Sequence, residues 1–595
     1  MDANRMRREN FTKEEFKKLD KRSNLLRLAG MMKPYWKHML LCVLLVIIVN
    51  VAELIKPLAA ATVIDDFITA GKEQHGFYSI TGLGLAYFLL IIIGAACQIL
   101  QSRTISWVSQ SILNSMRQNV FHRIQSMSIR ALDRYGTGRL ITRATNDIET
   151  INEFYSSVFL NLFRDIFLLI GIVSVMLALD VWLALISFIC IPVILLIVIS
   201  IRRIIKENFK FIKLVTGMIN GFFSENIMGM RIVQVFNAQK QKLAEFRKLN
   251  KDYFKGAITQ VFLNTILRPS MELINTLIIA LLVAYGYGRI TGDVNVLEVG
   301  ILYAFTNYVK QFFNPINDLA EKYTTVQSAF VSTDRIYELM DDPEVEARDG
   351  GHSAEKIRGE IEFRDVWFAY NEGEWVLRGV SFKIPAGTKA AFVGATGAGK
   401  STIINLITRC YDIQRGEILV DGVDVREWNL PTLRAGIATV LQDVFLFTGT
   451  IRENIDMGAR QPDDALNEAL TLADAHDFLE PIGGLDAKVT EQGLNFSTGE
   501  RQLLSFARAI ACHPSVLILD EATAHIDTDT ERRVQNAIEA ASRGRTSIYI
   551  AHRLSTIRQS DVIYYLKGGV ITESGSHDEL MALGGEYASL VEAGE

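Results

Sequence analysis

The sequence predicts a multi-domain protein, in which an all-α transmembrane domain of six long helices precedes an α/β domain of the P-loop NTPase type. Apolar stretches of membrane-spanning length recur up to about residue 329, and none follows residue 344. In the second half, a strand-like run at 389–393 and a helical segment at 402–406 flank a phosphate-binding pattern, Gly394-Ala395-Thr396-Gly397-Ala398-Gly399-Lys400-Ser401. Strand, loop and helix in this order are typical of a P-loop.

Changes in composition along the chain place the expected domain limits. Residues 1–38 are rich in Lys, Arg and Glu, and we expect a cytoplasmic N-terminus with an interfacial helix over 22–38. Residues 39–325 are expected to form the transmembrane domain with long cytoplasmic extensions, and 326–355 a linker. The nucleotide-binding domain is expected over 356–595.

Six mostly apolar segments are long enough to span a bilayer, at about 39–68, 78–105, 155–178, 182–201, 262–287 and 297–325. Only three residues, 179–181, join the third and fourth segments, which indicates a tight hairpin. Basic residues crowd the N-terminus and the connections at 103–164 and 202–268, whereas the other three connections hold only Lys72 and Arg289. The positive-inside rule therefore predicts a multi-pass protein of the plasma or inner membrane with both termini in the cytoplasm.

Charge inside a membrane span is costly and usually faces a cavity or a partner, and four of the charged residues in the predicted spans are candidates for such a role. Glu53 and Lys56 are three residues apart and can pair, while Glu272 and Lys310 lie in the fifth and sixth spans. For each residue, a structural ion pair and a substrate contact both remain open. As a set, the four residues indicate a polar inner surface.

Composition excludes some other classes of protein. The five cysteines are scattered and include no CxxC pair, which argues against a disulfide framework or a zinc site. The net charge of -5 over 595 residues gives no indication of a nucleic-acid partner.

The chemistry of phosphate binding explains the residue types in the P-loop pattern. Glycines let backbone N–H groups close around phosphate oxygens, and the following helix points its positive end at them. Lys400 is expected to reach the β- and γ-phosphates, and the Ser401 hydroxyl to bind Mg²⁺. The expected nucleotide contacts in this loop are Gly394, Ala395, Thr396, Gly397, Ala398, Gly399, Lys400, Ser401 and Thr402.

Polar side chains at the ends of other predicted strands complete a candidate ATPase site. Asp520 and Glu521 end the buried run 515–521, where the first would hold Mg²⁺ and the second would orient or deprotonate water. Gln442 follows the run 437–441 and can reach the metal or the water. His552 follows the strand 547–551 and can donate to the γ-phosphate, and Tyr370 can stack on adenine or lie as a plain surface aromatic.

With these residues assembled, the chain resembles a half-transporter of the ATP-binding cassette (ABC) exporters over essentially its whole length. The resemblance implies ATP-driven transport, with ATP and Mg²⁺ as cofactors. The implied partners are a second half-transporter subunit, the lipid bilayer and a small amphipathic or lipid substrate. The resemblance also implies two coupling helices, near Ile129–Tyr135 and Asn226–Arg231. It also implies roles for single residues: adenine stacking by Tyr370, Walker A at 394–401, the Q-loop at Gln442, Walker B at Asp520 with the catalytic Glu521, the D-loop at Asp527 and the switch histidine at His552.

One motif departs from the family pattern. Where the family usually has Leu-Ser-Gly-Gly-Gln, this chain has Phe496-Ser497-Thr498-Gly499-Glu500, and its D-loop, 524–527, also differs. In this family the signature of one subunit covers the ATP of the other, and the resemblance implies that Ser497 and Gly499 make such contacts here. Thr498 adds a Cβ where backbone should approach, and Glu500 adds an anion near the γ-phosphate. This pattern resembles the subunit of heterodimeric multidrug exporters that keeps the catalytic Glu and has a degenerate signature.

Three hypotheses follow for the function. The first is one half of a heterodimeric exporter of amphipathic drugs or lipids, and the second is a homodimeric lipid flippase, of lipid A-like molecules, or peptide exporter. The third is a regulatory ATPase whose membrane half is only an anchor. An anchor does not need six spans, long extensions and a polar inner face, so the sequence favours transport.

Overall fold

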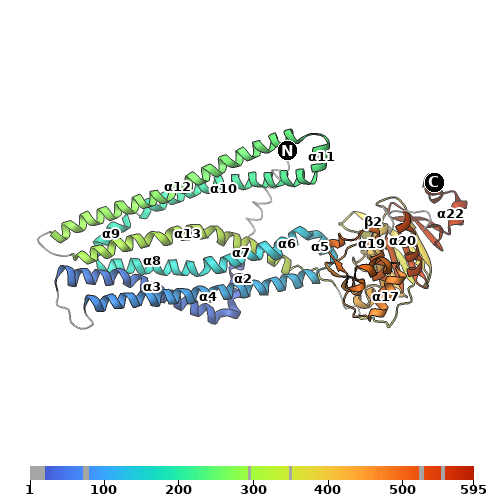
Figure 1. The fold of residues 1–595 in the computed structure, drawn as a ribbon, viewed down its shortest axis with the longest axis horizontal. Helices are drawn as coiled ribbons and strands as arrows, with labels where there is room; N and C mark the ends of the chain where they lie inside the picture. The colour runs from blue at the N-terminus through green and yellow to red at the C-terminus, as the bar shows by residue number, and fades with distance from the viewer. Residues whose placement is uncertain are drawn as a thin grey trace. The chain divides into compact units, whose positions relative to one another are not determined.

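The computed structural model describes residues 21–71, 79–189, 191–291, 297–346, 351–520, 528–550 and 557–594 (Figure 1). These residues form two compact units. The first unit is helical and comprises the described residues up to Phe121 together with Ile141–Asp341. The second unit combines His122–Leu140 with the residues from Asp342 onward.

The first unit consists of helices and π-helical turns, and two of its helices, α4 and α6, have part of their length in the second unit. The α-helices are α2 (Lys21–Met32), α3 (Trp36–Thr62), α4 (Ile80–Ser126), α6 (Thr137–Thr142), α7 (Ile148–Glu153), α8 (Leu160–Leu179), α9 (Val181–Ile189), α10 (Ile191–Met228), α11 (Met230–Val235), α12 (Gln239–Thr291) and α13 (Val299–Met340). The short 3₁₀ and π segments are η1 (Lys33–Tyr35), η2 (Val63–Thr69), η3 (Arg143–Asp147) and η4 (Phe154–Phe159).

Helices occupy all six predicted spans, which confirms the predicted class of the first half. Four continuous helical stretches among the described residues are long and apolar enough to cross a membrane: Asn24–Thr69, Ile80–Ser126, Thr137–Leu179 and Glu272–Ile290. The predicted hairpin is also confirmed, because α8 ends at Leu179 and α9 begins at Val181. Asp180 starts α9 by accepting a hydrogen bond from the N–H of Leu183 at 2.9 Å, and it pairs with Arg289 at 2.7 Å.

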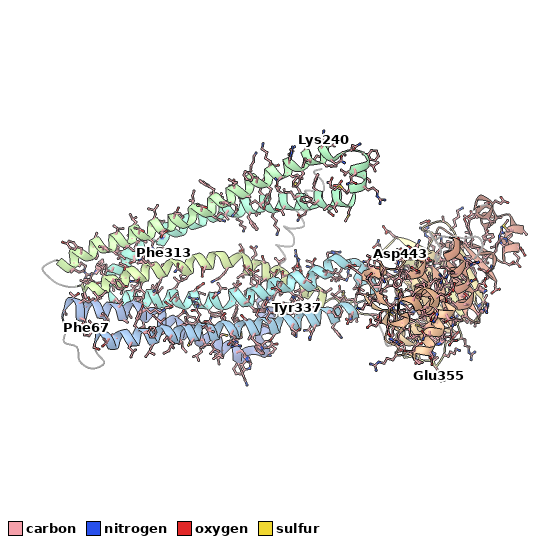
Figure 2. The ribbon with its side chains drawn as sticks, in the orientation of Figure 1. Phe67, Lys240, Phe313, Tyr337, Glu355 and Asp443 are labelled. Atoms are coloured by element: carbon pink, nitrogen blue, oxygen red, sulfur yellow. The ribbon has the colours of Figure 1, made fainter. Side chains whose placement is uncertain are left out.

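The core of the first unit lies where α3, α8, α9, α12 and α13 pack together. Its fully buried side chains include Ile172, Phe305 and Tyr308, and Phe313 belongs to the same cluster (Figure 2). Tyr308 also donates a hydrogen bond to the carbonyl of Leu54 at 2.5 Å, which ties α13 to α3. The helices α10 and α12 lie side by side and are joined at one end by α11, while α12 also packs against α9 and α13 (Figure 1).

The charged residues predicted inside the spans differ in their partners. Lys56 donates to Glu53 at 2.6 Å, so the predicted pair forms. Glu272 and Lys310 are exposed within this chain, and the side chain of Arg268 lies outside the described residues. A role of these residues in a substrate cavity remains a prediction.

The second unit contains two sheets and a short β-ribbon. Its strands are β1 (Ile361–Ala369), β2 (Trp375–Ile384), β3 (Lys389–Val393), β4 (Arg415–Val420), β5 (Val423–Asp424), β6 (Ile437–Val440), β7 (Gly449–Thr450), β8 (Lys488–Val489), β9 (Val516–Asp520), β10 (Thr546–Ile550), β11 (Val562–Lys567) and β12 (Val570–Gly575). The order is β2-β1-β4-β5 in one sheet and β12-β11-β3-β10-β9-β6 in the other, with β7-β8 separate.

Helices cover these sheets and complete the predicted α/β domain. They are α5 (Ile129–Tyr135), α14 (Lys400–Ile407), α15 (Leu430–Ala435), α16 (Ile451–Asp456), α17 (Asp463–Leu472), α18 (His476–Leu479), α19 (Thr498–Ala511), α20 (Thr528–Ser542), α22 (His577–Leu583) and α23 (Glu586–Gly594), with 3₁₀ turns η5 (Glu480–Ile482), η6 (Gly484–Asp486) and η7 (Glu491–Gly493). One apolar cluster lies between the two sheets around α14, and a second lies under α17, α19 and α20.

The two short helices implied by the resemblance are both present. The first, α5, has the expected limits, since Gly136 ends it with a φ of +74°. The second, α11, begins at Met230, four residues later than expected, because α10 continues to Met228 and only Gly229 separates the two helices.

Candidate nucleotide site

Four parallel strands bring the predicted site residues to one edge of the six-stranded sheet. Ile550 of β10 pairs with Phe392 of β3 on one side and with Asp520 of β9 on the other. On the far side of β9, Val440 of β6 pairs with Leu519. The carboxyl ends of these strands therefore meet, and ligands of open α/β sheets bind at such an edge.

The P-loop follows β3 directly, and its glycines are needed for geometric reasons. Gly394 has a φ of +147°, and a Cβ at this position would lie 2.1 Å from the carbonyl oxygen of Leu566. Gly399, with a φ of +105°, leads into α14, and its Cβ would lie 2.7 Å from the side chain of Leu377. The loop backbone thus reaches a conformation that ordinary side chains disfavour, which is the form a phosphate cradle requires.

Lys400 is the first residue of α14 and is almost completely buried, with 6% of its surface exposed. Its ammonium donates to the carbonyl of Gly394 at 2.5 Å and to that of Ala395 at 3.3 Å. These two hydrogen bonds hold the ammonium group of Lys400 next to the backbone of the P-loop. Ser401 is exposed at the start of the helix, while Thr402 is buried.

Tyr370 follows the end of β1, and α14 holds its hydroxyl. That hydroxyl lies 3.2 Å from the hydroxyl of Thr402 and accepts a hydrogen bond from the amide of Asn405 at 3.3 Å. Two rings pack edge-to-face against Tyr370, Phe368 at 4.8 Å and Tyr411 at 5.1 Å between centroids. Neither Asn405 nor Tyr411 belongs to a sequence motif, so no local pattern predicts their contacts with Tyr370.

The oxygen donors expected for Mg²⁺ have suitable chemistry and placement. Asp520 ends β9, Gln442 lies two residues beyond β6, and Ser401 lies in the first turn of α14. Among the residues that the structure describes, no cluster of three or more His, Cys, Asp or Glu side chains forms a separate metal site. Mg²⁺ usually takes one or two carboxylates and completes its shell with waters and substrate phosphates, so this donor set fits the ion.

Three predicted site residues lie outside the described residues. They are Glu521, Asp527 and His552. Their expected roles therefore remain predictions, with only their neighbours Asp520 and Ile550 placed at the sheet edge.

The unusual signature forms the N-terminus of α19. Ser497 is the N-cap, and its hydroxyl accepts from the N–H of Glu500 at 3.3 Å. In return, the carboxylate of Glu500 accepts from the N–H of Ser497 at 2.8 Å, which completes a capping box. Gly499 is buried in the first turn of this helix. The spacing of Ser and Glu alone could have predicted this box.

Two family descriptions match the chain in succession. Residues 39–316 match "ABC transporter transmembrane region", and residues 377–524 match "ABC transporter". The two matches correspond to the helical part and to the part that contains the P-loop.

Relatives and a solved structure resemble the chain over most of its length. A probable multidrug resistance ABC transporter ATP-binding/permease protein of Bacillus subtilis (strain 168) is 38% identical, over 88% of this chain and 78% of that protein. An ATP-dependent lipid A-core flippase of Syntrophus aciditrophicus (strain SB) is 33% identical, over 96% and 94%. The structure of a bacterial Atm1-family ABC exporter with ATP bound has a TM-score of 0.76 and 27% identity, over 94% of this chain and 98% of that one.

Proposed function

Since the chain belongs to the ABC transporter family, we propose that it is one half of a heterodimeric exporter that moves amphipathic small molecules or lipids across the membrane by alternating access. The chain is a membrane-embedded ABC exporter half-transporter that works as a dimer, and its α/β domain binds and hydrolyses ATP to drive transport.

The proposed roles of the site residues follow from their chemistry. Lys400 and the N–H groups of 394–402 bind the phosphates, and Tyr370 stacks on the base. Ser401, Gln442 and Asp520 would hold Mg²⁺, which supplies charge neutralisation at the phosphates. Glu521 orients or deprotonates the attacking water, and His552 donates to the γ-phosphate. Both termini and the domain at 356–595 lie in the cytoplasm, given the basic connections on that side.

The observation that carries the heterodimer proposal is the position of Glu500. Its carboxylate accepts from the N–H of its own N-cap, Ser497, and so places a negative charge at the N-terminus of α19. An intact signature would instead offer neutral donors to the γ-phosphate held by the other subunit. A fixed anion at this point repels that phosphate. The site that this signature covers is therefore degenerate, and the chain's own P-loop and Glu521 serve the competent site.

An exposed apolar surface supports a partner subunit. None of the residues of α11 is buried within this chain. Ile232, Val235 and Phe236 are 64%, 71% and 76% exposed. Apolar patches of this kind mark protein–protein contacts, and a second subunit is the occupant that a dimeric exporter supplies.

The substrate class rests on the relatives and on the polar residues of the predicted spans. One relative is named for multidrug resistance and another for lipid A-core flipping, at comparable sequence identity. Amphipathic molecules are the class that we propose to include both kinds of substrate. A homodimeric lipid flippase is the second candidate, favoured by the flippase relative, which aligns over 96% of this chain.

Repair of the signature separates the two candidates. Thr498→Gly combined with Glu500→Gln should increase the amount of nucleotide retained at the partner's P-loop, because an anion is removed from beside its γ-phosphate while Gln still completes the capping box. In a heterodimer, total ATP turnover should change less than about twofold if the partner lacks a catalytic carboxylate. Turnover and trapped nucleotide are measured per complex, before and after repair.

The capping box of α22 provides a matched control. Glu579 accepts from the N–H of Ser576 at 2.8 Å in the same arrangement, far from any signature sequence, so Glu579→Gln should change neither quantity. Severalfold activation after repair, with two equivalent sites per complex, would favour the homodimer instead.

A further inference from the structure

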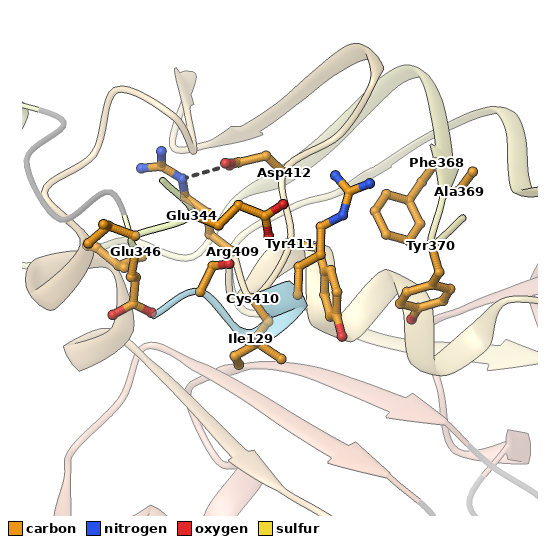
Figure 3. Close-up of a pocket in the computed structure, with 14 residues that line it drawn as sticks. Ile129, Glu344, Glu346, Phe368, Ala369, Tyr370, Arg409, Cys410, Tyr411 and Asp412 are labelled. Carbon is orange, nitrogen blue, oxygen red and sulfur yellow. Dashed lines mark hydrogen bonds and ion pairs between the residues drawn. The ribbon is translucent and has the colours of Figure 1, made fainter. Parts of the chain in front are cut away.

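A three-ring cluster in the second unit surrounds the base-stacking candidate Tyr370. Besides the two contacts of Tyr370, the rings of Phe368 and Tyr411 lie 5.8 Å apart, so each ring contacts the other two. Figure 3 shows the rings of Tyr370 and Tyr411 side by side at one end of a cavity. Edge-to-face pairs of this kind restrict how each ring can turn.

Tyr411 is also bonded to the short helix α5. Its hydroxyl donates to the carboxylate of Asp133, although the two residues lie 278 positions apart in the sequence. A hydrogen bond to an ionised carboxylate is stronger than one between neutral groups. Burial, and then the contact with Asp133, raise the pKa of Tyr411 above its ordinary value, so the phenol remains a donor throughout the physiological pH range.

The helix α5 itself is held in a defined position within the second unit. Ser128 caps its N-terminus by accepting from the N–H of Ala131 at 3.2 Å. At its other end, Tyr135 donates to Asp342 at 2.9 Å, and Arg134 pairs with Asp342 at 2.5 Å and with Glu344 at 3.1 Å. These contacts fasten the C-terminal end of the helix to the segment 342–344.

The same segment reaches the loop that carries Tyr411. Glu346 pairs with Arg434 at 2.7 Å, and Arg434 donates to the carbonyls of Thr408 and Arg409, each at 3.1 Å. The start of α5 at 128–130, the segment 344–346 and the loop 409–412 line an open cavity of about 230 Å³, and the end of β1 with Tyr370 lines the same cavity (Figure 3). Because α5 follows α4 after only two residues, its position is linked by the chain to a predicted membrane span.

We propose that Tyr411 is a positioning residue that couples α5 to the base-binding end of the nucleotide site, through its hydroxyl on one side and its ring on the other. Stacking of adenine on Tyr370 immobilises that ring, and the edge-to-face contact passes the restriction to Tyr411 and on to Asp133. By reciprocity, a displacement of α5 weakens binding of the base. This inference rests on the proposed stacking role of Tyr370. It adds Tyr411 as a residue that links the bound base to α5 without contact with the phosphates.

Hydrogen exchange with ATP tests the proposal in the full-length chain, purified with its partner in lipid nanodiscs. ATP should slow amide exchange both at 394–402 and at 129–135. Tyr411→Phe keeps the ring but removes the hydroxyl, so ATP should still protect 394–402 while protection of 129–135 falls about fivefold or more, the range of an ordinary coupling between sites. Tyr564→Phe is the matched control, since Tyr564 donates at 2.8 Å to the carbonyl of Lys383, elsewhere in the same unit.

Two further measurements test whether the coupling runs from the base through the hydrogen bond between Tyr411 and Asp133. In an Asp133→Ala background, Tyr411→Phe should have no additional effect on exchange at 129–135, because the shared hydrogen bond is already lost. Inorganic tripolyphosphate, which lacks a base, should protect 394–402 in the unmodified chain without protecting 129–135.

The outcomes are distinct. Equal ATP-dependent protection of 129–135 in Tyr411→Phe and in the unmodified chain would overturn the proposal, as would full protection by tripolyphosphate or additive effects of the two substitutions. Loss of protection at 394–402 in Tyr411→Phe would also overturn it, since Tyr411 would then act on binding itself. Failure of ATP to protect 394–402 in the unmodified chain would instead contradict the proposed nucleotide site.

Discussion

Glu521→Gln is expected to lower the ATP turnover of the purified complex by roughly 10²–10⁴-fold while leaving ATP binding nearly unchanged. Glu521 directly follows Asp520, which ends β9 at the edge where the P-loop strand also ends. The substitution keeps the size of the side chain but removes the carboxylate that we propose orients or deprotonates water. Turnover and the dissociation constant for ATP are measured on the same preparation.

An exposed carboxylate of the same domain serves as the control. Glu539→Gln on α20 should leave both quantities unchanged, because this residue is exposed and lies beyond the site. If Glu521→Gln retained turnover within a few-fold of the unmodified complex, Glu521 would not be the catalytic base.

Lys400→Met is expected to reduce kcat/KM for ATP by about 10²–10³-fold, the range for loss of one preorganised group that stabilises developing charge. The methionine side chain fills the space of the buried Lys400 stem, which is 6% exposed, so the loss should come from the ammonium and not from packing. In contrast to Glu521→Gln, ATP binding should fall as well, because the proposed contact of the ammonium with the phosphates is made before as well as during the reaction.

The control for this change is Lys567→Met. Lys567 is 64% exposed and pairs with Glu586, outside the P-loop, so its loss should not affect turnover. Unchanged ATP binding in Lys400→Met would contradict the contact that we assign to Lys400.

Local sequence patterns were sufficient for the elements that carry the nucleotide site. The strand predicted at 389–393 coincides with β3, and the run 515–521 contains β9, Val516–Asp520. Both are short apolar runs that end at glycine or at charged residues, and parallel strands buried on both faces have this form. The glycines of the P-loop then fixed the position of Lys400, because the loop and its helix follow the strand without interruption.

Contacts between distant residues could not be predicted from such patterns. Nothing near Tyr411 or Asp133 in the sequence indicates that they meet, since only the tertiary fold brings α5 to the loop after α14. The late start of α11 has a different cause, because helix propensity continues through 226–228 and Gly229 alone marks the break. By contrast, the capping box between Ser497 and Glu500 follows a known local pattern, Ser followed three residues later by Glu, and is predictable from the sequence.

The composition of the native complex tests the heterodimeric exporter most directly. The tagged Glu521→Gln chain is purified from its own membrane, its partners are identified by mass spectrometry, and its trapped nucleotides are counted. We predict one copy of a different half-transporter for each copy of this chain. ATP should be trapped at this chain's P-loop, and the nucleotide at the partner's P-loop should exchange with free nucleotide at a different rate. A complex of two copies of this chain with two equivalent trapped nucleotides would contradict the proposal.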